Sequence, residues 1–134
     1  MAKLLIVDDD KNLRLLYEQE LTDEGHEVVL ASSGPEALDY LKTQHPQLII
    51  LDISMPGMDG IEALGKILAK DKSMPVILNT AYSTYKDNFM TWSADAYVVK
   101  SGDLTELKAK IKDVLKTRAI KNPKCLTTEE EPTP

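Results

Sequence analysis

The sequence has little cysteine, no excess of positive charge and no long hydrophobic run, and each absence excludes a class of protein. Its single cysteine, Cys125, excludes an internal disulfide and a CxxC metal cage and suits a reducing compartment. Acidic residues outnumber basic ones by 22 to 16, giving a formal charge of −6, which argues against a nucleic-acid-binding surface. The apolar runs are too short to span a membrane, and no signal peptide is visible. We therefore expect a soluble, cytoplasmic protein that binds neither nucleic acid nor membrane.

Two patterns alternate along the 134 residues. Short runs rich in Val, Ile and Leu predict strands buried on both faces; they lie at residues 4–7, 28–31, 48–51, 76–78 and 96–99. Segments with helical spacing of apolar residues separate and follow them; their apolar faces comprise Leu13, Leu16, Tyr17 and Leu21, then Ala37, Leu38 and Leu41, then Ile61, Leu64, Ile67 and Leu68, and finally Leu104, Leu107, Ile111, Val114 and Leu115. Only the helix expected near residues 85–92 is poorly patterned. The alternation predicts an α/β protein, a flavodoxin-like (βα)5 doubly wound parallel sheet with strand order 2-1-3-4-5.

The chain length fits one domain, which we expect over residues 1–120. Residues 121–134 lack periodicity, carry a run of three Glu and end in Pro-Thr-Pro, so we expect a flexible tail or the start of a linker there. A docking or regulatory tail is the alternative interpretation of this segment.

Polar side chains follow the predicted strands that meet at the switch point of such a sheet. Asp8, Asp9 and Asp10 follow the first strand, and Asp52 follows the third. These two strands are neighbours about 4.8 Å apart, so their carboxylates are expected in one pocket. The fourth strand leads to Asn79-Thr80 and the fifth to Lys100, at the same edge of the sheet. Taken singly, Asp8, Asp9 or Asp52 could be a helix cap or the start of a turn, and for Asp10 a helix cap is our preferred interpretation.

Clustered carboxylates repel one another, and a hard divalent cation such as Mg²⁺ relieves that repulsion. Lys100 adds a positive charge on a flexible stem. A metal and an ammonium around one carboxylate can stabilise the charge of phosphoryl transfer, with Asp52 as the nucleophile that becomes an aspartyl phosphate. Thr80 supplies a hydroxyl that could bond a phosphoryl oxygen.

Several of these segments together resemble the receiver domain of two-component response regulators over about residues 3 to 118. The resemblance rests on four blocks in this order: Ile6-Val7-Asp8-Asp9-Asp10, Leu51-Asp52-Ile53-Ser54-Met55-Pro56-Gly57-Met58-Asp59-Gly60, Asn79-Thr80-Ala81-Tyr82 and Ala94-Asp95-Ala96-Tyr97-Val98-Val99-Lys100. The Met-Pro-Gly-Met-Asp-Gly loop after the Asp-ended strand is highly specific when the other blocks occur in this order, whereas any one block alone would be weak evidence.

The resemblance implies a role for each matching residue. Asp52 would accept a phosphoryl group from a sensor histidine kinase or a histidine phosphotransfer protein. Mg²⁺ would be held by Asp9, by Asp8 through water, by Asp52 and by the backbone carbonyl of Ser54. Lys100 would pair with Asp52 and then with the phosphoryl oxygens.

The resemblance also implies a switch. Thr80 would move toward the phosphoryl group and let Tyr97 turn inward, remodelling the face built from residues 85–92, strand 96–99 and the last helix. That face would engage a downstream target or a missing output domain, and a phosphorylation-dependent homodimer is left open. Such a protein is not an enzyme in the usual sense, because it catalyses only its own phosphorylation and dephosphorylation.

The sequence departs from the family pattern after Lys100. The family usually has Pro there, often with a cis bond, whereas Ser101 follows here. A cis bond before a non-proline residue costs about 3–4 kcal/mol, so we expect a trans bond and some displacement of Lys100. Ser54 and Tyr82 flank the path of an attacking water and are expected to tune the phosphoryl lifetime.

Three other functions are alternatives to this interpretation of the sequence. A phosphoaspartate hydrolase of the haloacid-dehalogenase type would need an Asp where Ser54 stands. A flavin or nucleotide carrier would need a phosphate-binding loop where Asp8 and Asp9 stand. A receiver-like interaction module that is never phosphorylated is the remaining alternative, favoured only by the missing Pro.

Three residues outside this cluster also have more than one interpretation. His26 and His45 lack a metal-ligand spacing and are expected at the surface. Leu15 lies off the apolar face of its helix, either as a docking contact for the phosphodonor or as an isolated surface leucine.

Overall fold

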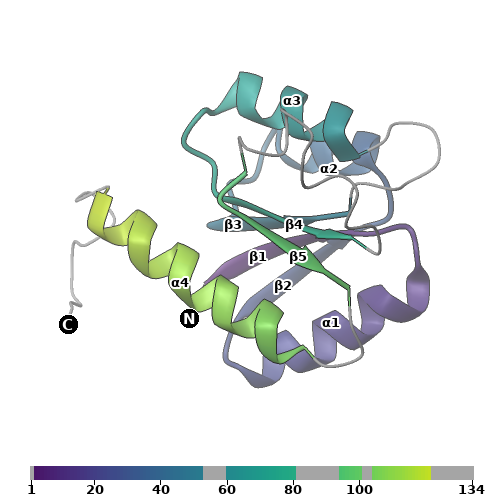
Figure 1. Ribbon diagram of the computed structural model, residues 1–134. Coiled ribbons are helices and arrows are strands. Elements are labelled where there is room, and N and C mark those ends of the chain that lie inside the picture. Colours follow the sequence, from purple (N-terminus) through teal and green to yellow (C-terminus); the bar gives the residue numbers. More distant parts are fainter. Residues whose placement is uncertain (1, 53–59, 81–93, 101–103, 122–134) are drawn as a thin grey trace.

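The computed structural model describes residues 2–52, 60–80, 94–100 and 104–121, which form a parallel sheet with helices on both faces (Figure 1). The strands are β1 (Lys3–Val7), β2 (Glu27–Ala31), β3 (Leu48–Leu51), β4 (Val76–Thr80) and β5 (Ala96–Val99). The helices are α1 (Lys11–Asp23), α2 (Gly34–Tyr40), α3 (Gly60–Lys70) and α4 (Thr105–Lys121). The sheet order β2-β1-β3-β4-β5 confirms the predicted flavodoxin-like topology. The helix expected near residues 85–92 lies outside the described residues.

Two apolar layers enclose the sheet, because successive strand residues point to opposite faces. Helices α2 and α3 cover one face, and α1 and α4 cover the other (Figure 1). In β3, for example, Ile49 and Leu51 pack on the α2–α3 side, whereas Leu48 and Ile50 pack on the α1–α4 side. All four β3 residues are buried, which is why the strand has no polar alternation in the sequence. β2, at the edge, is less buried.

Local signals in the sequence place the ends of α1. The Asp10 carboxylate accepts hydrogen bonds from the backbone N–H groups of Asn12 and Leu13, at 2.9 and 3.2 Å, and so caps the first turn. This confirms Asp10 as the start of the helix. After the helix, Gly25 adopts a φ of 96°, a conformation that residues with a Cβ rarely adopt.

One predicted core position is wrong. Leu16 was expected on the buried face of α1, yet it is 37% exposed, while Tyr17 and Leu21 are buried. The buried stripe of this helix is narrower than the apolar residues suggest, because only one side of α1 contacts the sheet.

Among the described helices, none combines the length and apolar content that a membrane crossing requires.

The strand pairing determines where the polar edge lies. β1 pairs in parallel with both β2 and β3, and Val7 and Leu51 are register partners at the ends of β1 and β3. The chain therefore leaves β1 at Asp8 and β3 at Asp52, at adjacent points of the same edge. This is the switch point of the sheet, where the strand order reverses direction along the sequence.

Candidate functional site

The loop after β1 presents two acidic side chains at this edge. Asp8 is 1% exposed, whereas Asp9 is exposed. The backbone N–H of Asp10 donates to Asp8 Oδ1 at 2.9 Å, which fixes the orientation of the Asp8 carboxylate. Since the Asp10 carboxylate is occupied as the cap of α1, it is Asp8 and Asp9 that this loop offers to the pocket.

Asp52 joins them from β3. Its backbone N–H donates to the carbonyl of Val7 at 2.9 Å, which extends the β1–β3 pairing by one residue and fixes Asp52 next to the acidic loop. The side chain is 4% exposed. One carboxylate oxygen from each of Asp8, Asp9 and Asp52 lies within 4.8 Å of the other two. The structure therefore brings together the three carboxylates that the strand ends predicted.

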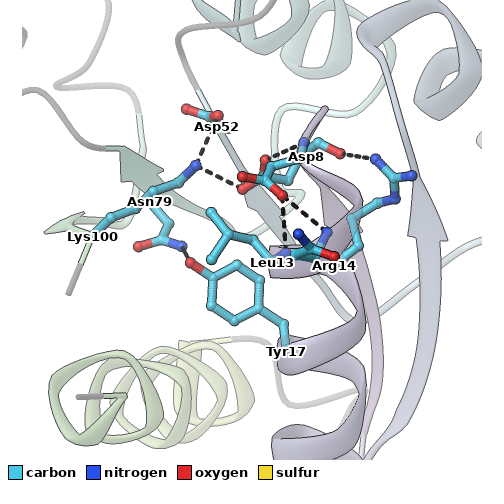
Figure 2. Close-up of polar contacts among 9 residues, drawn as sticks. Asp8, Leu13, Arg14, Tyr17, Asp52, Asn79 and Lys100 are labelled. Carbon is cyan, nitrogen blue, oxygen red and sulfur yellow. Dashed lines mark hydrogen bonds and ion pairs between the residues drawn. The ribbon is translucent and has the colours of Figure 1, made fainter. Parts of the chain in front are cut away.

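Lys100 reaches the same pocket from the end of β5. Its Nζ lies 2.8 Å from Asp8 Oδ2 and 3.0 Å from Asp52 Oδ2, and its side chain is 15% exposed (Figure 2). Burial by itself lowers the pKa of Lys100, but the contacts with Asp8 and Asp52 outweigh it and hold the pKa above its usual value. The lysine is therefore a fixed positive charge at neutral pH. The Lys100–Ser101 bond lies outside the described residues, and Lys100 nevertheless reaches Asp52.

The donor set fits a hard divalent cation. The cluster of three carboxylates holds one ammonium, which contacts Asp8 and Asp52, so the cluster has a formal excess of two negative charges. Within the described residues, Asp8 Oδ2 is buried and has the ion pair with Lys100 but no aligned hydrogen bond, so it retains capacity to bind a cation. Clustered carboxylate oxygens are the ligands that Mg²⁺ prefers. Asp8, Asp9 and Asp52 are thus the side chains that could hold Mg²⁺.

The two residues predicted as switch elements lie on adjacent strands. Thr80 ends β4, is fully buried, and its carbonyl accepts a hydrogen bond from the Lys100 N–H at 2.6 Å. Tyr97 in β5 is half-buried and packs against the core layer on the α2–α3 side. Of the remaining predicted site residues, Ser54 and Tyr82 lie outside the described residues. Residues 122–134 of the expected tail also lie outside them, and Lys121 ends α4.

Two residues that contact or adjoin this site, Arg14 and Tyr17, were not among the site residues predicted from the sequence. Arg14 donates from Nη1 to the backbone carbonyl of Asp8 at 2.7 Å and so braces the acidic loop (Figure 2). Tyr17, predicted only as a core residue, accepts a hydrogen bond from Asn79 Nδ2 at 2.9 Å. No side-chain spacing in the sequence signals the Arg14 contact, because its acceptor is the backbone carbonyl of Asp8.

The two histidines contact residues outside the carboxylate cluster, and Leu15 is exposed. Leu15 is 48% exposed on α1, which agrees with both of its interpretations, a docking contact and an isolated surface leucine. His45 is exposed, as expected, and its Nε2 lies 3.1 Å from Asp71 Oδ2. His26 is half-buried rather than a plain surface residue, and its Nδ1 accepts a hydrogen bond from the Ala2 N–H at 3.2 Å.

Comparison with known families agrees with this geometry. The family model of the response regulator receiver domain matches residues 4–112. The chain therefore belongs to the response regulator receiver domains of two-component signal transduction, a family of signalling proteins.

Individual relatives and solved structures point the same way. The chain is 38% identical over 128 residues to a probable transcriptional regulator, ycf27, of Cyanophora paradoxa, covering 94% of this chain and 52% of that protein. It is 46% identical to the response regulator TrrA of Thermotoga maritima, solved in complex with Mg²⁺ and BeF, with a TM-score of 0.82 and coverage of 85% and 99%. A structure of the histidine kinase ThkA in complex with TrrA matches with 46% identity, a TM-score of 0.81 and coverage of 86% and 99%. The chain spans about half the length of the curated relatives it matches.

Proposed function

We propose that this chain accepts a phosphoryl group on Asp52 from the phosphohistidine of a sensor histidine kinase or a histidine phosphotransfer protein. The observation that carries the proposal is the Asp52 carboxylate, 4% exposed, beside two further carboxylates and 3.0 Å from Lys100 Nζ. An Asp52 oxygen attacks phosphorus, the P–N bond to histidine breaks, and the imidazole leaves with the bonding electron pair and takes up a proton. Hydrolysis of the aspartyl phosphate by water reverses the state, so the chain catalyses only its own phosphorylation and dephosphorylation.

The other site residues orient this transfer and balance its charge. Asp9 would hold Mg²⁺ directly and Asp8 through water, together with Asp52 and the backbone carbonyl of Ser54. When bound, Mg²⁺ supplies neutralising charge to the phosphoryl oxygens. Lys100 exchanges its contact with Asp52 for a phosphoryl oxygen, which its flexible stem allows. The Mg²⁺–BeF complex of TrrA supports this assignment, since that protein is 46% identical to this chain.

The proposed output is a change of one face. Thr80 bonds the phosphoryl group, Tyr97 turns inward, and the face of residues 85–92, β5 and α4 is remodelled. Its partner would be a downstream protein, an output domain or a second copy of the phosphorylated chain. We propose a receiver domain over residues 1–120 with a tail or linker over residues 121–134, in keeping with curated relatives about twice as long. The cytoplasmic location stays a prediction from the sequence.

The ThkA–TrrA complex supports a histidine kinase as the phosphodonor. The opposing hypothesis is an interaction module with the receiver fold that is never phosphorylated. A direct measurement of phosphoryl uptake separates the two.

Intact-protein mass measured after incubation with acetyl phosphate and Mg²⁺ tests the proposal. We expect the mass of one phosphoryl group to be added to the wild type, none to Asp52→Asn, and none when EDTA removes Mg²⁺. Asp39→Asn is the matched control, because Asp39 is exposed and pairs only with Lys42 among its described neighbours. Wild-type protein that gains no mass from acetyl phosphate or from a phosphorylated kinase would establish the interaction module instead.

A further inference from the structure

We propose that the buried hydrogen bond between Tyr17 and Asn79 positions the phosphoacceptor site by anchoring the end of β4 to α1. The two residues act through Thr80 and Lys100 and touch neither phosphorus nor metal, so they are positioning residues. The inference rests on the proposed function in one respect, namely that Asp52 is the phosphoacceptor. The pair itself is a feature of the fold.

The pair is a polar contact inside an apolar layer. Asn79 Nδ2 donates to Tyr17 Oη at 2.9 Å across 62 residues of sequence (Figure 2). Tyr17 is 2% exposed and Asn79 is 3% exposed. The surrounding layer is formed by apolar residues of the strands, α1 and α4. An amide buried there is unfavourable unless it is hydrogen-bonded, so Tyr17 supplies the acceptor that Asn79 requires.

On the strand side, the anchor lies next to the predicted switch residue. Asn79 is followed by Thr80, whose side chain points to the opposite face of the sheet. The Thr80 carbonyl accepts the Lys100 N–H at 2.6 Å, and Thr80 is the register partner of Val99. A displacement of Asn79 therefore moves Thr80 and the backbone from which Lys100 reaches Asp52.

On the helix side, the anchor lies on the element that braces the acidic loop. Tyr17 follows Arg14 by one turn of α1, and Arg14 donates to the Asp8 carbonyl at 2.7 Å. The Tyr17–Asn79 bond thus joins the helix that supports Asp8 to the strand that supports Thr80. Burial raises the pKa of Tyr17, so its hydroxyl stays protonated at neutral pH and keeps a neutral partner for Asn79.

A purely apolar pair of similar volume would fill the same space without burying polar groups. Such a pair would lack directionality. A hydrogen bond fixes the distance and angle between donor and acceptor, whereas apolar side chains in contact can shift slightly relative to each other. A positioning role and a packing role therefore predict different results when the polar pair is replaced by an apolar one.

The first test measures backbone order without phosphorylation. The quantity measured is the ratio of the deuterium exchange rate of the Lys100 amide to that of the Ile50 amide. In Tyr17→Phe, we expect this ratio to rise by about fivefold to tenfold, because losing one hydrogen bond shifts a local opening equilibrium by about that factor. Tyr40→Phe is the matched control. The Tyr40 hydroxyl is buried without a hydrogen bond in the described part of the chain, and the ring packs on the α2–α3 side. An unchanged ratio in Tyr17→Phe, or an equal change in Tyr40→Phe, would overturn the proposal.

The second test measures phosphoryl uptake from acetyl phosphate at saturating Mg²⁺. We expect a slower uptake in Tyr17→Phe and Asn79→Leu, with the half-saturating Mg²⁺ concentration unchanged because all three carboxylates remain. The double variant Tyr17→Phe, Asn79→Leu should regain stability to urea but not the uptake rate. A rate that recovers together with stability, or a rate equal to wild type in both single variants, rules out positioning. If the wild type takes up no phosphoryl group, the proposed function fails and the exchange ratio alone decides this inference.

Discussion

At the scale of single residues, the charge balance around Lys100 dominates the site. Its ammonium lies within 3.0 Å of both Asp8 and Asp52, and all three side chains are 15% exposed or less. Removing such charges from water is costly, and their mutual attraction offsets the cost only while the partners stay together. Without Lys100, the buried carboxylates of Asp8 and Asp52 would lie near each other and near the exposed Asp9, with no described cation to offset their repulsion.

Lys100→Met should therefore destabilise the protein in the absence of Mg²⁺. We expect the free energy of unfolding to fall by about 2 kcal/mol, less than the roughly 3–5 kcal/mol that breaking a fully buried pair costs, because the site adjoins solvent. Added Mg²⁺ should stabilise the variant more than the wild type, since the carboxylates then lack a competing cation. Urea unfolding with and without Mg²⁺ measures both effects. Lys66→Met, at an exposed position of α3, serves as the control and should leave stability nearly unchanged. Equal stability of Lys100→Met and wild type would contradict the importance of this pair.

The sequence predicted residues of the site where backbone topology alone determines their position. Asp8, Asp52 and Lys100 each follow a strand end, and parallel strands end at one edge whatever the details of packing. The contact between Tyr17 and Asn79 was not predicted, because it depends on the orientation of α1 about its own axis relative to β4. A tyrosine on an apolar helix face fits core packing equally well, and Leu16 was misplaced for the same reason.

At the scale of secondary structure, the cap of α1 links helix stability to the geometry of the acidic loop. Asp10 accepts from two backbone N–H groups and also donates its own N–H to Asp8 Oδ1. The side chain thus stabilises the helix, while the backbone orients a proposed Mg²⁺ ligand. These two contributions are separable by mutation, since a substitution removes only the side-chain contacts.

Asp10→Ala should lower the free energy of unfolding by about 1 kcal/mol, the usual cost of losing a helix N-cap. Asp10→Asn keeps an acceptor oxygen at the same place and is expected to lose only a small part of that stability. Both variants should retain the Mg²⁺ affinity of the wild type, because Asp10 is not among the clustered carboxylates. Chemical denaturation and Mg²⁺ titration are the measurements. A loss of Mg²⁺ affinity in Asp10→Asn comparable to that in Asp9→Ala would instead make Asp10 a ligand.

The strands were easier to predict than the helices. An unbroken apolar run such as residues 48–51 has few structural alternatives between two polar turns, and its predicted bounds coincide with β3. The apolar run at residues 76–78 covers only part of β4, because the strand continues through the polar residues Asn79 and Thr80, which were predicted at its end and are buried. Their polarity reflects the site at the end of the strand rather than the end of the strand itself.

At the scale of the whole molecule, β1 ties the amino-terminal end of the sheet to the site. The carboxyl end of β1 leads into Asp8. Just before its amino end, the Ala2 N–H donates to His26 Nδ1 at 3.2 Å, and the Ala2 carbonyl accepts a hydrogen bond from the Glu27 N–H. Only neutral His26 can accept the Ala2 hydrogen bond, because protonation turns Nδ1 into a donor. Burial lowers the pKa of His26, and the positive charge of the amino terminus adds to the effect.

The sign of the resulting pH dependence follows from linkage. A histidine whose pKa is lower in the folded than in the unfolded protein contributes stability above its unfolded pKa of about 6.5 and loses it as the pH falls through the folded pKa. We expect the free energy of unfolding of the wild type to decrease between about pH 7.5 and about pH 5.5. His26→Gln, whose side-chain carbonyl accepts the same hydrogen bond without titrating, should show a shallower decrease. Urea unfolding across this range tests the expectation, and parallel curves for His26→Gln and wild type would refute it, leaving the carboxylates as the source of any remaining pH dependence.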